Sequence, residues 1–198
     1  PQIDNAADWA IKKYKGWGID SELHEFGEWD GWERGITHID MTAPRIRTLS
    51  GMQLAYSPST SEDGIEGEIV FIPEVENKEE FADWLKTIKG KFVLSSMYQP
   101  SGRPDYNWEK FATEKSLQKI RKERQEAARK WSANFRKMGV NRRNINNTLE
   151  EAGAIGLLSN NWAGGFGANR IFSAGTKNIP NIDLRLEDYT MLYRMVKS

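Results

Sequence analysis

The sequence contains no cysteine and only two histidines among its 198 residues. The lack of cysteine excludes disulfide bonds, thiol nucleophiles and thiolate metal sites, although it does not fix the cellular compartment. No stretch approaches the roughly 18 apolar residues that a membrane-spanning helix needs, so we expect no membrane span. The 28 basic and 28 acidic side chains cancel. This balance argues against a nucleic acid or an anionic membrane as a bulk electrostatic partner.

What the chain does contain is a series of short apolar patterns with helical or strand periodicity. They predict a helix near residues 7–14 and strands at 21–29 and 34–42, with a turn at Asp30-Gly31 between the strands. They also predict strands at 52–56 and 65–72, a helix that begins at Asn77, and a buried strand at 91–95. The order strand, helix, strand favours a mixed sheet covered by helices, and therefore an α+β fold.

Residues 106–143 have a different character, with 12 basic against 4 acidic side chains and aromatic residues between them. The pattern predicts one long helix or two shorter helices. Three interpretations stay open: a solvated helical insertion, an element that docks on another protein, and an arm that binds nucleic acid.

The glycine-rich stretch at residues 150–167 raises the question of a phosphate-binding loop. Such a loop leads from a strand into the N-terminus of a helix. Here residues 148–152 predict the end of a helix, Gly153 fits its left-handed C-cap, and residues 154–158 predict the following strand. Because this order is the reverse of the required one, we do not expect a nucleotide site.

The loop after that strand carries the side chains that we consider candidates for contact with substrate: Asn160, Asn161, Trp162 and Phe166. Aromatic and amide side chains on a glycine-rich loop are typical of binding surfaces. The alternative interpretation is a mobile surface turn without a role in binding.

The two histidines offer a weak metal signal. In His38-Ile39-Asp40, strand alternation would place the imidazole and the carboxylate on one face, and His24 could supply a third zinc ligand from a neighbouring strand. A partly exposed strand face explains the same pattern. The G-x-S-x-G motif of serine hydrolases is absent, and no set of residues forms a catalytic constellation by itself.

Several stretches together carry a family resemblance. They are residues 6–9 with 22–26, 54–60 with 67–70, the lysine-glycine-lysine strand start at 89–94, the helix-to-strand step at 152–157, and 179–182 with 186–189. In this order and spacing the chain resembles the non-catalytic front part of secreted zinc peptidases of the M28 type, the aminopeptidases and their carboxypeptidase-like relatives, including the inserted protease-associated domain.

The resemblance implies an α+β protease-associated domain of the swivelling β/β/α type at residues 50–198, with mixed β-sheets, flanking helices and a basic helical insertion at about 106–145. Residues 1–49 would be a helix and strands that pack on a catalytic domain. The resemblance places the zinc ligands of the parent peptidase past Ser198, so we expect neither catalytic residues nor a cofactor in this chain.

The function implied is gating of substrate or protein interaction in a secreted or periplasmic exopeptidase. The expected partners are the downstream catalytic domain and a peptide substrate. Two alternatives remain: a self-sufficient zinc hydrolase that uses His24, His38 and Asp40, and a free-standing interaction module.

Overall fold

A computed structural model describes residues 2–28, 31–166 and 169–198. The chain divides into two compact units, residues 1–33 and residues 34–198. The first unit contains the predicted helix, α1 (Gln2–Gly16), which Gly18 follows with φ of +76°. Residues 19–28 form no strand, so the strand expected at 21–29 is wrong over its described part. Leu23 and Phe26 are 60% and 89% exposed, so this segment buries no face that would hold a strand in register. The expected turn at Asp30-Gly31 includes Asp30, which lies outside the described residues.

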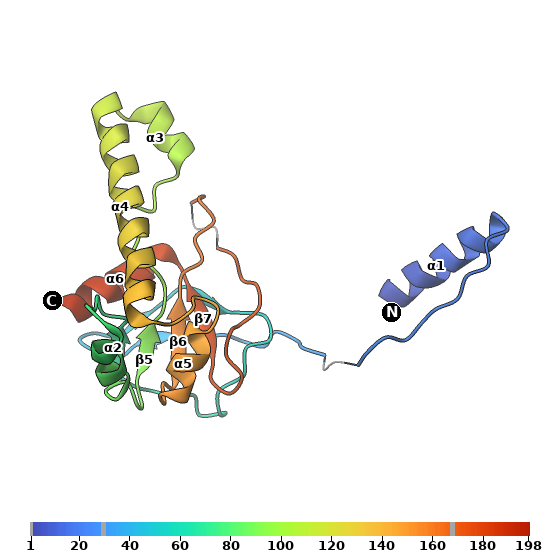
Figure 1. Ribbon diagram of the computed structural model, residues 1–198, viewed down its shortest axis with the longest axis horizontal. Helices are drawn as coiled ribbons and strands as arrows, with labels where there is room; N and C mark the ends of the chain where they lie inside the picture. The colour runs from blue at the N-terminus through green and yellow to red at the C-terminus, as the bar shows by residue number, and fades with distance from the viewer. Residues whose placement is uncertain (1, 29–30, 167–168) are drawn as a thin grey trace. The chain divides into compact units, whose positions relative to one another are not determined.

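The second unit is built on a five-stranded mixed sheet, so the chain has the α+β fold that the sequence predicts (Figure 1). Four strands run parallel, and β3 pairs antiparallel with β7 at one edge. In spatial order the strands are β3 (Gly51–Gln53), β7 (Asn181–Leu184), β6 (Gly156–Ser159), β5 (Phe92–Leu94) and β4 (Ile69–Phe71).

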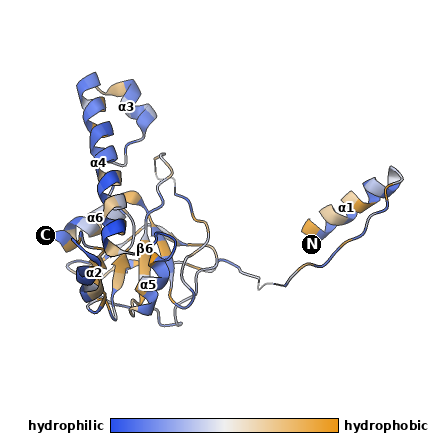
Figure 2. Ribbon diagram, viewed as in Figure 1, coloured by the Kyte–Doolittle hydropathy of each residue, from blue (hydrophilic) through white to orange (hydrophobic). Residues whose placement is uncertain are grey.

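Helices connect the parallel strands. α2 (Lys78–Leu85) joins β4 to β5, and Asn77 caps it by accepting the Glu80 N–H at 2.9 Å, as the sequence predicts. The β5–β6 connection contains three helices, and α6 (Leu186–Lys197) follows β7. The three are α3 (Asp105–Phe111), α4 (Glu114–Met138) and α5 (Ile145–Glu151). The predicted helical insertion is thus a short and a long helix, α3 and α4. Figure 1 shows α4 projecting beyond the sheet with α3 beside it, and Figure 2 shows that the projecting part is largely hydrophilic.

The two faces of the sheet pack in separate apolar clusters, because successive strand residues point to opposite faces. On one face Val93 and Leu157, both 0% exposed, pack with buried residues of α2, α4 and α5. On the other face Leu94, Leu158 and Leu184 pack with buried residues of α6. Strands that are covered on both faces read as continuous apolar runs, which is why β5 and β6 could be found from sequence.

The glycine-rich stretch behaves as its direction predicts, helix first and strand second. Gly153 takes φ of +91° just after α5, where a left-handed residue ends the helix. At Gly156 a Cβ would lie 2.6 Å from the Phe92 ring on the neighbouring strand. The small residue therefore permits close packing within the sheet rather than phosphate binding.

A second, two-stranded sheet consists of β1 (Asp40–Met41) and β2 (Arg47–Thr48). The strand expected at 34–42 is therefore wrong in extent, since only Asp40 and Met41 pair with β2 in a ladder. Met41 and Leu49 are nevertheless buried in the cluster beside α6. The domain boundary expected near residue 50 stays a prediction.

Candidate functional site

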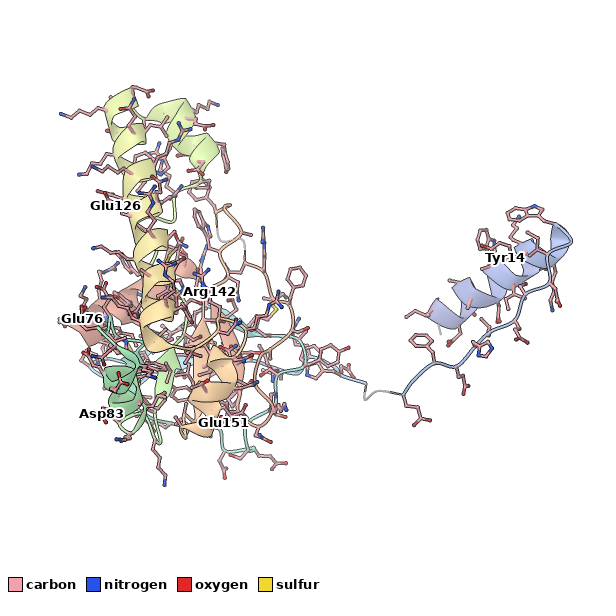
Figure 3. The ribbon with its side chains drawn as sticks, viewed as in Figure 1. Tyr14, Glu76, Asp83, Glu126, Arg142 and Glu151 are labelled. Atoms are coloured by element: carbon pink, nitrogen blue, oxygen red, sulfur yellow. The ribbon has the colours of Figure 1, made fainter. Side chains whose placement is uncertain are left out.

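The candidate site lies at the carboxyl ends of β5 and β6. In open sheets the loops that leave the carboxyl ends of parallel strands commonly form binding crevices. Here such loops border a cavity of about 310 Å³, together with α4, the α4–α5 connection and the start of β7. Polar side chains that line it include Ser96, Arg142, Asn146, Asn160, Asn161 and Asn181. Arg142, labelled in Figure 3, has its guanidinium 5.3 Å from the centre of the Phe135 ring.

Two of the four predicted contact residues, Asn160 and Asn161, line this cavity and are held firmly at its wall. The Asn160 N–H donates to Ser96 Oγ at 2.9 Å, and its Nδ2 donates to the Leu184 carbonyl at 2.7 Å. Asn161 donates both its N–H and its Nδ2 to Asp183 Oδ1, at 2.7 and 2.8 Å. These hydrogen bonds anchor both amides to β7. The alternative interpretation, a mobile surface turn, does not describe this part of the loop.

The other two residues, Trp162 and Phe166, lie beyond the anchored amides and meet the helical insertion. Trp162 Nε1 donates to the Gly165 carbonyl at 2.8 Å, and the Arg124 guanidinium lies 4.9 Å from the Trp162 ring centre. Phe166 is 60% exposed and meets the Tyr106 ring edge-to-face at 6.3 Å. The structure thus brings the loop and α3 into one aromatic surface, which we call the loop–hairpin surface (Tyr106, Arg124, Trp162 and Phe166).

Arg124 connects α3, α4 and the loop. Its guanidinium pairs with Asp105 and donates to the backbone carbonyls of Ser101 and Arg103, at 3.2 and 2.6 Å. Arg103 in turn stacks over the Trp108 ring at 4.6 Å. The sequence analysis left the role of residues 106–143 open and did not single out Arg124, which connects this segment to the chain before it. Nothing in the local charge pattern distinguishes Arg124 from its exposed neighbours.

Asp183 is the buried ionisable side chain of the site, and the sequence analysis did not identify it. It is 1% exposed, and its Oδ1 accepts from Asn161 and from Ser159 Oγ at 3.2 Å. Burial raises the pKa of the Asp183 carboxyl, and the hydrogen bonds from Asn161, Ser159 and Asn169 oppose part of that rise. The available signal was the alternation of polar and apolar residues in Asn181-Ile182-Asp183-Leu184.

His38 and Asp40 lie side by side as expected, and the pair is at the surface. His38 Nε2 lies 2.8 Å from Asp40 Oδ2, and Thr48 Oγ1 donates to Asp40 Oδ1 at 2.7 Å. The hydrogen bonds from Thr48 and His38 lower the pKa of the Asp40 carboxyl. His24 belongs to the first unit, where its Nε2 lies 3.5 Å from Glu22 Oε1.

The donor set for zinc is incomplete in the described part of the chain. Residues 2–28, 31–166 and 169–198 contain no group of three or more His, Asp or Glu side chains placed to hold a metal ion. The His38–Asp40 pair alone does not fit zinc, which takes at least three protein ligands. Among the same residues, no helix has the length and apolar character needed to cross a membrane.

The comparisons with known proteins point to one fold. No protein-family model and no curated protein matches the chain. The crystal structure of a peptidase M28 precursor from Shewanella amazonensis SB2B matches with a TM-score of 0.52 and 18% sequence identity, over 99% of this chain and 39% of that chain. The chain therefore has an M28-related fold and spans about two fifths of the length of that peptidase chain.

Proposed function

We propose that this chain is a non-catalytic, protease-associated part of a secreted or periplasmic M28-type zinc exopeptidase. The supporting observation is that nearly all of the chain matches well under half of a peptidase M28 precursor. In this proposal the zinc ions belong to a separate catalytic domain. The partners are that domain and the peptide substrate.

The loop–hairpin surface is where this part would meet the peptide. Phe166 and Tyr106 are each 60% exposed, while Arg124 holds α3 against the loop. Exposed aromatic side chains on a supported loop can bind at a low cost in conformational entropy. The anchored amides Asn160 and Asn161 give the loop its rigid base.

The test uses the full-length protein that carries this chain. Phe166→Ala should raise KM for a peptide substrate about fivefold, because truncation of an aromatic contact costs about 1 kcal/mol. The turnover number and the zinc content should stay unchanged. Phe111→Ala is the control, since Phe111 is 65% exposed but lies at the far end of α3. An unchanged KM for Phe166→Ala would contradict a role in substrate contact.

The self-sufficient zinc hydrolase remains the competing proposal, and elemental analysis of the purified chain separates the two. Stoichiometric zinc, with peptidase activity that His38→Ala removes, would favour the hydrolase. Absence of both would favour the non-catalytic role.

A free-standing interaction module is the third proposal. Its specific support is the projecting α3–α4 hairpin, on which Tyr106 and Phe111 are exposed. If the hairpin carries the function, deletion of residues 106–145 should abolish capture of a partner, whereas capture that survives the deletion would contradict this proposal.

A further inference from the structure

A second cavity, of about 470 Å³, lies beside the candidate site, and the proposed function does not use it. Ser96, Met97 and Trp131 border both cavities. The larger cavity lies at the carboxyl ends of β4 and β5, between one face of α4 and the last turns of α6. Its volume falls in the range of small-molecule sites, about 300–1,000 Å³.

Aromatic side chains form one wall of this cavity. The Tyr193 ring packs against the Phe71 and Tyr98 rings, with 4.9 Å between ring centres in both pairs. Trp131 lines the cavity from α4, and the Lys197 ammonium lies 5.8 Å from the centre of the Tyr193 ring. Such a wall favours a ligand with an aromatic ring of its own, because offset and edge-to-face ring contacts add to the burial of apolar surface.

Buried polar side chains hold both helices of the cavity in place. On α4, Asn134 Nδ2 donates to the Pro73 carbonyl at 2.7 Å, and Asn134 Oδ1 accepts from the Val75 N–H at 3.0 Å. On α6, the Tyr189 hydroxyl bonds to the carbonyl and the N–H of Ser96, at 2.6 and 2.9 Å. The cavity is therefore preformed, which lowers the cost of ligand binding in conformational entropy.

Charged side chains of both signs line the cavity without pairing with one another. They are Glu74, Glu123, Glu126, Lys130, Arg194 and Lys197. In the described part of the chain no ion pair joins two of these six, since Glu123 and Glu126 meet other lysines along α4, at 3.8 and 3.9 Å. Burial raises the pKa of the Tyr193 hydroxyl, and the negative charge of Glu74 adds to the rise. Glu74 therefore lies close to the aromatic wall.

The charges restrict the kind of ligand that the cavity can hold. An ion of one sign would face like charges, because three of the six side chains are acidic and three are basic. Water would hydrate the charges but would gain nothing from the aromatic wall. A zwitterion with an aromatic ring matches the acidic, basic and aromatic side chains together.

The distribution of the charges over the two helices favours a zwitterion whose charges are separated. The charged side chains that α6 contributes are both basic, whereas α4 contributes Glu123 and Glu126 with Lys130. The two charges of a free amino acid sit on one carbon atom. Those of a short peptide sit at its two ends, where each can meet a different helix.

We propose that this cavity binds a zwitterionic peptide of about dipeptide size that carries an aromatic side chain. Arg194 and Lys197 on α6 bind its carboxylate. Glu123 and Glu126 on α4 bind its ammonium group, and Figure 3 labels Glu126. The ring of the ligand packs on the aromatic wall. This inference does not depend on the proposed peptidase role.

An NMR titration of the isotope-labelled whole chain with alanylphenylalanine tests the proposal. The expected dissociation constant is about 0.1–1 mM, with shifts confined to α4, α6 and the loops after β4 and β5. The N-acetyl derivative lacks the ammonium group, the C-terminal amide lacks the carboxylate, and alanylalanine lacks the ring. Each of the three should bind about fivefold more weakly. No saturation by about 10 mM alanylphenylalanine, or equal affinity for all four compounds, would overturn the proposal.

Variants of exposed residues assign the two ends of the ligand. Arg194→Gln should weaken the binding of alanylphenylalanine about threefold to fivefold, but should not change the binding of its amide, which has no carboxylate. Glu126→Gln should weaken the dipeptide to a similar degree and leave the N-acetyl derivative unaffected. The matched controls are Arg129→Gln and Glu114→Gln, at exposed positions of α4 outside the cavity. A variant that weakens the dipeptide and its blocked derivative equally, or weakens neither, would refute the site.

Discussion

Both faces of β7 contain fully buried residues, and the two faces are stabilised in different ways. Leu184, 0% exposed, packs among apolar side chains beside α6. Asp183, 1% exposed, accepts hydrogen bonds from Ser159 Oγ and from the N–H and Nδ2 of Asn161. Apolar contacts are complete once the space is filled, whereas polar groups also require a matching donor for each acceptor. The apolar face is therefore stabilised by packing, and the polar face by specific hydrogen bonds.

The largest expected effect is on the apolar face. Leu184→Ala should lower the free energy of unfolding by about 2–5 kcal/mol, because it leaves a cavity in a filled core. Urea unfolding measures the change. Met52→Ala on β3, where Met52 is 41% exposed, should cost less than about 1 kcal/mol. A loss at Leu184 no larger than at Met52 would break the contrast between the faces.

Tyr189 sharpens the comparison because it is a fully satisfied polar group beside the apolar cluster. Its hydroxyl donates to the Ser96 carbonyl at 2.6 Å and accepts from the Ser96 N–H at 2.9 Å. Tyr189→Phe should cost about 1–3 kcal/mol, since both Ser96 groups lose their partner. Chemical denaturation checks this, with Tyr106→Phe at an exposed site as the matched control. A neutral result would mean that water replaces the hydroxyl.

Arg124 extends the comparison to the hairpin, where its polar contacts add to the burial of Leu117 and Ile120 on α4. Arg124→Met should increase amide hydrogen exchange in α3 about tenfold, because the contacts with Asp105, Ser101 and Arg103 are lost. The exchange of β6 should not change. Lys122→Met, which removes an exposed charge from the same helix, should leave α3 protected. Equal exchange in the two variants would show that Arg124 does not hold the hairpin.

The smallest effect concerns Asp40, a hydrogen-bonded carboxylate that is exposed where Asp183 is buried. Because its folded-state pKa lies below the ordinary value of 3.8, its contribution to stability is present above that value. The contribution is lost as the pH falls through the lowered pKa. The melting temperature of Asp40→Asn should therefore be slightly below that of the wild type at pH 6, and the gap should narrow as the pH falls below 3.8. A gap that widens in acid would contradict this sign.

Much of the second unit could be predicted from local pattern. The cap at Asn77, the buried strands β5 and β6 and the end of α5 at Gly153 each follow from residues within a few positions of one another. The strands expected at 21–29 and 34–42 were wrong in the described residues, apart from the two residues of β1. Alternation of polar and apolar residues predicts only which face of a strand each side chain occupies. A strand also needs a neighbouring strand with which its backbone groups form hydrogen bonds.

For the candidate site, the loop after β6 was predicted, and its surroundings were not. Asn160 and Asn161 were singled out as contact residues, and the structure places them at a cavity wall. Asp183 and Arg124 were missed because their partners lie 22 and 38 residues away, at Asn161 and Trp162.

The sequence by itself determined the order of the elements, the α+β class and the direction of the glycine-rich step from helix to strand. These properties depend on periodicity and on backbone preferences, which are local. Only the tertiary structure decided that Asp183 is buried and that Ser159 and Asn161 donate hydrogen bonds to it. That outcome depends on which strands become neighbours, because burial turns a polar side chain into one that needs a specific partner.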